Sequence, residues 1–363
     1  MLLKEVYNEN FLNLIAKTTA AIDKKFDQKK FLKILKDNWS AKELKQRMRA
    51  ITIALDESLS SKKYPQKIEI LKRVASEIPK DKSSGLALIV FPDYVEVFGR
   101  DDFEISMQAL EFFTEFGSSE FAIRQFIKLD QKRALLFFAK WTKSKNHHVR
   151  RLASEGCRPR LPWGEALPVF KKNPAAILAI LENLKYDESQ YVKKSISNNL
   201  NDISKDNPEI ILDLLTKWQK EKVSERLVNH ALRTLLKKGD QTAMKLIGVN
   251  DNNLSKNFAI QTFALQKAMV NISGNLLFEF SLHNQVPNNK IRLEYVVYFL
   301  RQNGTHGKKN FQITTKSFAE GVFNFTKKHS LRDMTTRKHY AGRHFISLVV
   351  NGVEFQKLQF DLI

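Results

Sequence analysis

The sequence predicts a mainly α-helical protein, in which a HEAT-like α-solenoid is followed by an all-β immunoglobulin-like sandwich. Two observations support this prediction. Helix signals recur about every 35–43 residues from residue 101 onward, which is the period of stacked helix pairs. After about residue 271 the pattern changes to short alternating segments rich in Phe, Val and Ile. We therefore expect a helical repeat domain over residues 1–270 and a β-sandwich domain over residues 271–363.

The first 80 residues show the spacing of amphipathic helices with basic exposed faces. A helical cap on the solenoid and a direct functional role are equally compatible with this pattern. The next apolar segment, residues 86–98, is rich in β-branched side chains, and a short strand and a buried helix both fit it. The four apolar stripes of the first region lie within residues 11–22, 31–35, 44–55 and 68–74.

The repeat itself is visible as recurring helix starts and recurring valines. Asp130, Asn173 and Asn207 have the character of helix N-caps, and proline follows the second and third of them, at the position that a helix start tolerates. A second helix follows each of these first helices. Matching positions in these second helices are occupied by Val149, Val192 and Val228. Each helix pair can bury its apolar face only against the next pair, which predicts stacking.

The two positions after each repeat valine are cationic or polar. They are occupied by Arg150 and Arg151, then by Lys193 and Lys194, and then by Asn229 and His230. Stacked repeats, spaced on the order of 10 Å apart, would align these side chains in two ladders that could follow a phosphate backbone. The alternative is that they are the solvated faces of ordinary helices.

Residues 147–164, HHVRRLASEGCRPRLPWG, have the most unusual composition in the chain. Val149 to Glu155 reads as two helical turns, which places Arg151 and Glu155 one turn apart on the same face. Gly156 is expected to end the helix. Two prolines then hold the following loop extended, and Trp163 lies at its end. A cationic helix leading into a stiff loop with an exposed indole suggests an anionic, flat ligand.

The C-terminal region divides into alternating segments separated by Gly, Asn-Gly and Pro-Asn turns, and five to seven strands are expected there. Before them we expect one more helix, from Leu254 to Met269, and a junction. Tyr340 is a candidate for the corner tyrosine of such sandwiches. Basic loop residues are either a second DNA contact or solvated turns, namely Lys308, Lys309, Arg332, Arg337 and Lys338.

Composition narrows the function. The chain has 60 Lys and Arg against 39 Asp and Glu, a net charge of +21, which favours a polyanionic partner, first nucleic acid and only second an anionic membrane. No apolar run is long enough to span a bilayer, and no signal peptide is apparent. The single cysteine, Cys157, fits a reducing cytoplasm. Motifs for nucleotide, zinc or serine-hydrolase chemistry are missing from the sequence, so we expect neither cofactor nor metal.

The segment from His147 to Gly164 also resembles the signature of the AlkC branch of the DNA alkylation repair glycosylases, relatives of AlkD built from HEAT-like repeats. The resemblance covers about residues 85–240 and, more loosely, the rest, where some AlkC proteins have an Ig-like domain. It implies excision of N-alkylated bases, especially 3-methyladenine and 3-methylcytosine. It further implies that Glu120, Glu155, Trp163 and Asp202 surround the lesion.

From the residues alone, each of the three carboxylates also has a purely structural explanation. Glu120 can favour a helix N-terminus, Glu155 can pair with Arg151, and Asp202 can be a turn residue. The chemistry nevertheless suits carboxylates, because a base methylated at N3 is already cationic and leaves without a proton. A fixed carboxylate stabilises the positive charge that grows on the deoxyribose and polarises the attacking water, and an indole face favours a cation.

The sequence therefore gives a candidate set and two candidate functions. The first is a monofunctional alkylbase DNA glycosylase, cytoplasmic and nucleoid-associated, acting on double-stranded DNA as a monomer without an obligate protein partner or membrane contact. The alternative is a non-catalytic HEAT-repeat nucleic-acid-binding or scaffold protein. The expected DNA-binding residues are His147, Arg150, Arg151, Arg158, Arg160, Lys193, Lys194, Asn198 and Arg124.

Overall fold

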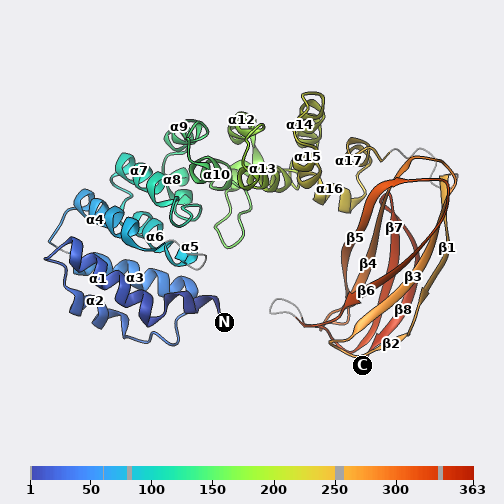
Figure 1. Cartoon of the computed structure of the whole chain (residues 1–363), viewed down its shortest axis with the longest axis horizontal. Helices are drawn as coiled ribbons and strands as arrows, with labels where there is room; N and C mark the ends of the chain where they lie inside the picture. Colours follow the sequence, from blue (N-terminus) through green and yellow to red (C-terminus); the bar gives the residue numbers. More distant parts are fainter. Residues whose placement is uncertain (1, 60, 80–83, 250–256, 334–337) are drawn as a thin grey trace. The chain divides into compact units, whose positions relative to one another are not determined.

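The computed structural model (Figure 1) divides the chain into two compact units, each with its own set of elements. The first unit, residues 1–211 with 221–231, is helical; the second, residues 212–220 with 232–363, contains helices and the strands. The fold class predicted from the sequence is confirmed. Residues 2–59, 61–79, 84–249, 257–333 and 338–363 are described by the structure.

The first unit begins with amphipathic helices. They are the 3-10 helix η1 (Leu3–Tyr7), α1 (Glu9–Ile22), α2 (Gln28–Leu35), α3 (Leu44–Ser58) and α4 (Tyr64–Glu77). Each predicted apolar stripe supplies side chains that are fully removed from solvent, among them Ile15, Phe31, Ile51 and Leu71. The helical spacing of these residues therefore reflects a shared core.

Residues 86–98, for which strand and helix were both open, are helical. They contain the end of α5 (Ser84–Ala87) and all of α6 (Val90–Phe98), followed by α7 (Phe103–Phe113) and α8 (Ile123–Leu129). Every residue from 90 to 95 is buried. A helix surrounded by other helices has no polar face, which explains why the sequence shows no clear period here.

The repeat region follows as helix pairs. It contains α9 (Gln131–Trp141), α10 (His147–Glu155), α11 (Pro168–Lys172), α12 (Ala175–Leu184), α13 (Gln190–Ile203) and α15 (Glu225–Ala231). Helices α10, α13 and α15 pack in one row, and α9 and α12 pack in a second row against it (Figure 1). The second helix of each predicted pair therefore belongs to a single row.

Two of the predicted caps and the repeat valines have the expected roles. Asp130 caps α9, and the side chain of Asn173 accepts the first amide of α12 at 3.0 Å. Val149, Val192 and Val228 are all buried in the row of second helices. The positions that follow these valines thus lie on α10, α13 and α15, which pack side by side.

The second unit contains a sandwich of two sheets. Its strands are β1 (Phe258–Leu265), β2 (Met269–Val270), β3 (Asn275–Asn284), β4 (Asn289–Leu300), β5 (His306–Phe318), β6 (Gly321–Ser330), β7 (Gly342–Val350) and β8 (Val353–Leu362). One sheet has the order β1-β3-β6 and the other β2-β8-β7-β4-β5, with β2 parallel to β8 and the other pairs antiparallel. Alternate residues of both sheets, such as Phe278, Phe280, Leu293 and Leu348, form the core between them.

The helix expected from Leu254 to Met269 is wrong over its described part, while residues 254–256 lie outside the described residues. Phe258–Leu265 forms strand β1, which pairs with β3 from Phe258 opposite Asn284 to Leu265 opposite Phe278. The spacing of apolar residues in FAIQTFAL fits either structure, and the free edge of β3 decides between them. The strands therefore begin before residue 271.

A close backbone approach attaches α16 (Arg233–Lys238) to the sandwich. Gly239 ends this helix with φ +77°, and a Cβ there would lie 3.0 Å from the carbonyl oxygen of Gly352, which itself has φ +83°. The side chain of Asn310 also donates to the Lys237 carbonyl at 3.1 Å. Both glycines therefore allow a contact between main chains that no other residue fits. Two further helices of this region are α14 (Pro208–Lys220) and α17 (Gln241–Leu246).

The polar residues expected to have special roles in the sandwich have mixed outcomes. The main-chain carbonyl of Tyr340 accepts a hydrogen bond from Nε2 of His344 at 2.9 Å. A corner tyrosine acts through its hydroxyl, so this role of Tyr340 stays a prediction. Lys308 lies in β5 and pairs with Glu354 at 2.7 Å. Arg337 lies outside the described residues. A second DNA contact through these basic residues stays a prediction.

A buried histidine connects the two sheets. Nδ1 of His329, in β6, lies 2.9 Å from the hydroxyl of Tyr295, in β4, and Nε2 has no hydrogen-bond partner among the described residues. The rings of Phe299 and Phe311 pack against it. Burial, helped by the nearby His339, lowers the pKa of His329 to about 4.

This depressed pKa predicts acid sensitivity of the sandwich. The unfolded chain, with a histidine pKa of about 6.5, binds a proton that the folded chain rejects, so stability is complete above pH 6.5 and is lost as the pH falls toward 4. Between pH 7 and pH 5 the free energy of unfolding should fall by about 2 kcal/mol less in His329→Gln than in the wild-type protein. Hydrogen exchange of the β4 and β6 amides, corrected for intrinsic rates, measures this; identical pH dependence in both proteins would contradict it.

Candidate active site

Helix α10 presents the residues around which the site is built. Its first turn is capped by Asn146, whose side chain accepts the amide of His148 at 2.8 Å. The helix ends at Glu155, as predicted, but Gly156 is not there for a left-handed turn, because its φ is −63°. A Cβ at Gly156 would lie 2.7 Å from Cγ2 of Ile123. Glycine is thus required because α8 packs directly against the end of α10.

Arg124 holds both ends of the loop that follows α10. Its side chain is almost completely buried; Nη1 donates to the Gly156 carbonyl at 3.1 Å and Nε donates to the Glu165 carbonyl. Burial lowers the pKa of Arg124 to about 10. The expectation that Arg124 binds DNA is therefore corrected: it fixes both ends of the loop. A single sequence does not distinguish a buried arginine on an amphipathic helix from an exposed one.

The tip of this loop exposes Trp163. The residue has φ +63°, its side chain is 62% exposed, and its carbonyl accepts a hydrogen bond from Lys45 of α3. The amide of Leu167 donates to the Pro159 carbonyl at 3.1 Å and closes the loop. The indole is therefore presented to solvent by a backbone that is fixed at its base and at its tip.

Two carboxylates expected at the site, Glu155 and Asp202, share one arginine. Nη1 of Arg158 lies 2.6 Å from Oε1 of Glu155, and Nε and Nη2 each lie 2.9 Å from Oδ2 of Asp202. All three side chains are buried. Ser195 of α13 donates to Oε2 of Glu155 at 2.6 Å, and Lys205 donates to Oδ1 of Asp202 at 3.0 Å. Asp202 lies in the last turn of α13, so it is not the turn residue considered above.

The third carboxylate joins the same network through Arg151. This arginine contacts Oε2 of Glu120 and lies 3.4 Å from Oε1 of Glu155. Ser118 donates to Oε2 of Glu120 at 2.9 Å, and the Arg151 guanidinium lies 5.0 Å from the ring centre of Tyr191. Glu120, Glu155 and Asp202 are therefore connected, in this order, by Arg151 and Arg158.

The network changes the expected roles of several arginines. Burial lowers the pKa of Arg158, but the adjacent carboxylates of Glu155 and Asp202 outweigh it and the pKa is raised. The pKa of Arg151 is raised in the same way, by the carboxylates of Glu120 and Glu155. Both were expected to hold phosphates, and the structure instead gives them carboxylate partners. The sequence showed that Arg151 and Glu155 lie one helical turn apart. It could not show that Arg158 reaches a carboxylate on α13.

Two more of the expected DNA-binding residues are paired with carboxylates outside the network. Arg150 binds Asp187 with Nε–Oδ2 at 2.6 Å, and Arg160 binds Asp206 with Nη2–Oδ1 at 2.6 Å. Lys193 and Lys194 lie on α13 at a more open surface, with Lys194 exposed. The side chain of Asn198 lies 3.1 Å from Nε2 of His230.

Histidine 147, also expected to bind DNA, is exposed at the start of α10. Its ring lies 4.4 Å from that of His148, and both rings contact Tyr191 edge-on. The sequence did not identify Tyr191, Ser195 or Lys205 as members of the site. Their common signal is the spacing along α13 relative to Asp202, which becomes informative only once α10 and α13 are known to pack together.

The buried thiol next to the network has no catalytic character. Burial raises the pKa of Cys157 to about 12, and its sulfur lies 3.3 Å from Nδ2 of Asn199. A neutral, enclosed thiol is a poor nucleophile and a poor metal ligand. In the described residues, no group of three or more His, Cys, Asp or Glu side chains is placed to hold a metal ion.

This arrangement has the chemistry of a fixed electrostatic site. Three carboxylates with little solvent exposure are held in place by two arginines, and the loop that follows α10 exposes an indole. Such a site can stabilise a cation that forms beside it and orient a water molecule.

None of the described helices has both the length and the apolar character that a membrane-spanning helix needs.

Comparisons with known proteins identify the family. Residues 114–236 match the family described as DNA alkylation repair enzyme, and residues 259–363 match the C-terminal Ig-like domain of the uncharacterised protein YhaZ. Protein YhaZ of Bacillus subtilis, itself uncharacterised, is 39% identical over 99% of both chains. The chain also matches a solved structure of Pseudomonas fluorescens alkylpurine DNA glycosylase AlkC bound to DNA with an abasic site analog, at 36% identity, TM-score 0.94 and complete coverage of both chains.

This chain belongs to the AlkC-type family of DNA alkylation repair enzymes. The resemblance inferred from residues 147–164 is thereby confirmed, and so is the Ig-like character of the C-terminal domain. That segment lies within the matched repair-enzyme region, residues 114–236.

Two arginines of this segment, Arg158 and Arg160, should differ in the cost of their substitution. Arg158→Met leaves Glu155 and Asp202 buried without their shared cation and should lower the free energy of unfolding by about 3–5 kcal/mol. Arg160→Met is the matched control, because its pair with Asp206 is partly exposed and should cost less than about 1 kcal/mol. Urea unfolding followed by tryptophan fluorescence measures both. Equal losses in the two variants would contradict the buried network.

Proposed function

We propose that this AlkC-type chain is a monofunctional DNA glycosylase that hydrolyses the N-glycosidic bond of cationic N3-alkylated bases in double-stranded DNA. The expected substrates are 3-methyladenine and 3-methylcytosine. The observation that supports this most directly is the connected set of Glu120, Glu155 and Asp202 within an otherwise basic protein. A protein that only bound phosphates would gain from losing these charges.

The chemistry requires little of the protein beyond fixed negative charge. The alkylated base leaves with the electron pair of the glycosidic bond and becomes neutral, so it needs no proton from a general acid. The deoxyribose becomes positively charged as the bond breaks, and fixed carboxylates lower the energy of that state. Water then adds to C1′ and releases a proton, which leaves an abasic site and the free base.

The burial of the three carboxylates supports a division of roles. The side chain of Glu120 is 15% exposed, against 6% for Glu155 and 3% for Asp202. Both described partners of Glu120 contact Oε2, so Oε1 is available in the described part of the chain to a water molecule or to the sugar. In this proposal Glu120 makes the contact, while Glu155 and Asp202 supply negative potential from behind it.

Trp163 is assigned as an aromatic wall against the cationic nucleotide. Its exposure and the hydrogen bonds that hold its loop support this role, because a fixed indole face attracts a cation without reordering. Lys193 and Lys194 remain the expected residues at the phosphates. Arg151 and Arg158 position carboxylates in this scheme and do not contact phosphates.

The decisive experiment measures free bases released from DNA that has been treated with a methylating agent. Glu120→Gln, Glu155→Gln and Asp202→Asn should each lower the single-turnover excision rate about 10²–10³-fold. Affinity for DNA with an abasic-site analogue should change little, because these residues do not hold the backbone. Mass spectrometry identifies the bases, and fluorescence anisotropy measures the affinity.

Asp206→Asn is the matched control, since this carboxylate also pairs with an arginine but lies outside the network. It should excise at the wild-type rate. If the wild-type protein releases no base yet binds DNA in a salt-sensitive way, the alternative of a non-catalytic nucleic-acid-binding or scaffold protein is favoured.

A further inference from the structure

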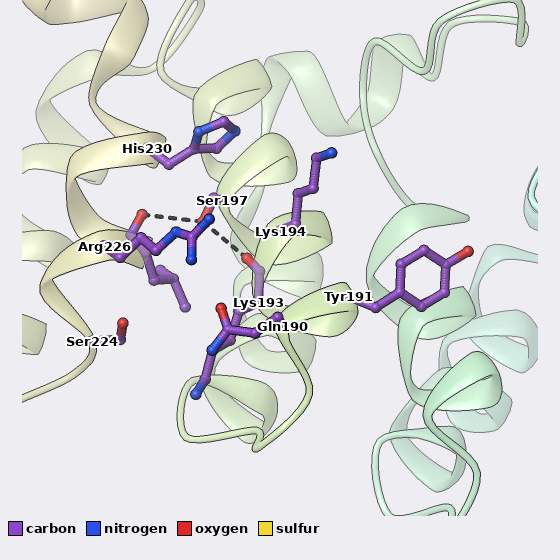
Figure 2. Close-up of a pocket in the computed structure, with 9 residues that line it drawn as sticks. Gln190, Tyr191, Lys193, Lys194, Ser197, Ser224, Arg226 and His230 are labelled. Carbon is purple, nitrogen blue, oxygen red and sulfur yellow. Dashed lines mark hydrogen bonds between the residues drawn. The ribbon is translucent and has the colours of Figure 1, made fainter.

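A cavity of about 370 Å³ lies between α13 and α15, outside the carboxylate network (Figure 2). Its polar lining comes mainly from Gln190, Lys193, Lys194 and Ser197 of α13, with Arg226 and His230 of α15. Of the described residues that line it, none carries a carboxylate. A cavity with two lysines and an arginine but no acidic side chain has a positive potential and should bind an anion.

The base of this cavity is rigid. Oγ of Ser197 lies 2.9 Å from the Lys193 carbonyl and 3.1 Å from the Leu227 carbonyl, which joins α13 to α15 (Figure 2). His230 is held in contact with Asn198 at 3.1 Å. Ser197 and the contact between Asn198 and His230 therefore join the two helices along the cavity, whose lining includes Lys193, Lys194 and Arg226.

The cavity is next to the proposed catalytic site, and the two differ in that only the catalytic site contains carboxylates. Tyr191 belongs to its lining but points away from Arg226, as Figure 2 shows, and its ring lies under the Arg151 guanidinium, 5.0 Å from it. On the other side of α13, Ser195 and Asp202 contact the α10 segment. Helix α13 thus separates the carboxylate network, toward α10, from the basic cavity, toward α15.

We propose that this cavity binds a backbone phosphate of the DNA strand beside the nucleotide that is excised, with Arg226 as its principal ligand. A guanidinium can bind two non-bridging phosphate oxygens at once, and the two lysines add charge. The inference rests on the proposed function, and it explains how the sugar could face Glu120 while the adjoining phosphate is neutralised. Arg226 was not among the residues that the sequence suggested.

The first test is the salt dependence of binding to a duplex with an abasic-site analogue, measured by anisotropy from about 50 to 200 mM salt. Arg226→Gln should weaken binding several-fold and reduce the slope of log K against log salt by about 0.9. Lys132→Gln, at an exposed cation of α9, is the matched control and should leave the slope unchanged. A wild-type slope in Arg226→Gln would overturn the proposal.

A second measurement identifies the phosphate. Duplexes in which single linkages near the lesion are replaced by neutral methylphosphonate should show one linkage that weakens wild-type binding. That same replacement should have no further effect in Arg226→Gln, or in Lys194→Gln if Arg226→Gln does not fold. Additive losses at every linkage would overturn the assignment.

Calorimetry with inorganic phosphate separates a backbone phosphate from a free one. Phosphate binding that Arg226→Gln removes without any change in DNA affinity would show a site for free anions and would overturn the proposal. Excision by the wild-type protein is measured separately. If the wild-type protein excises no base, the proposed function is contradicted. If excision is normal but the salt slope of Arg226→Gln is unchanged, only the proposed phosphate site in this cavity is contradicted.

Discussion

The guanidinium of Arg158 connects two segments that are 44 residues apart in the sequence. On one side it binds Glu155 at the end of α10, and on the other it binds Asp202 in the last turn of α13. Two buried carboxylates would repel each other if no cation lay between them. The packing of α10 against α13 at the site therefore depends on this one side chain.

The packing around Arg158 serves the same arrangement. Gly156 lets α8 approach the end of α10, and Arg124 fixes the start and the end of the loop that carries Trp163. Ser195 fixes the second oxygen of Glu155 from α13. Each of these contacts restricts where a carboxylate or the indole can lie, which is what electrostatic catalysis requires of its surroundings.

Much of the fold could be predicted because its signals are local. The helix caps at Asp130 and Asn173 and the repeat valines lie where their spacing placed them, and the alternating pattern of the last 90 residues, roughly, is that of a sandwich. The segment Phe258–Leu265 was misassigned because its eight residues fit two periods, and only the free edge of β3 selects the strand.

The candidate site was predictable in its carboxylates but less so in its cations. Glu120, Glu155 and Asp202 lie in one network, while Trp163 lies on an exposed loop. An arginine in a sequence does not reveal whether its partner is a phosphate, a carboxylate or a carbonyl, because that depends on residues far along the chain. Arg124, for example, binds main-chain carbonyls of the loop after α10. Lys193, which was expected to bind DNA in the same way, lines a basic cavity between α13 and α15.

The state of Cys157 has a consequence for a protein that works where DNA is being methylated. Electrophiles that modify ring nitrogens of bases also modify thiolates, and an exposed, ionised cysteine is among the most reactive groups a protein offers. Here the chain's single thiol is fully enclosed and kept protonated. The folded protein thus withholds its most vulnerable atom from the very reagents whose damage its family repairs.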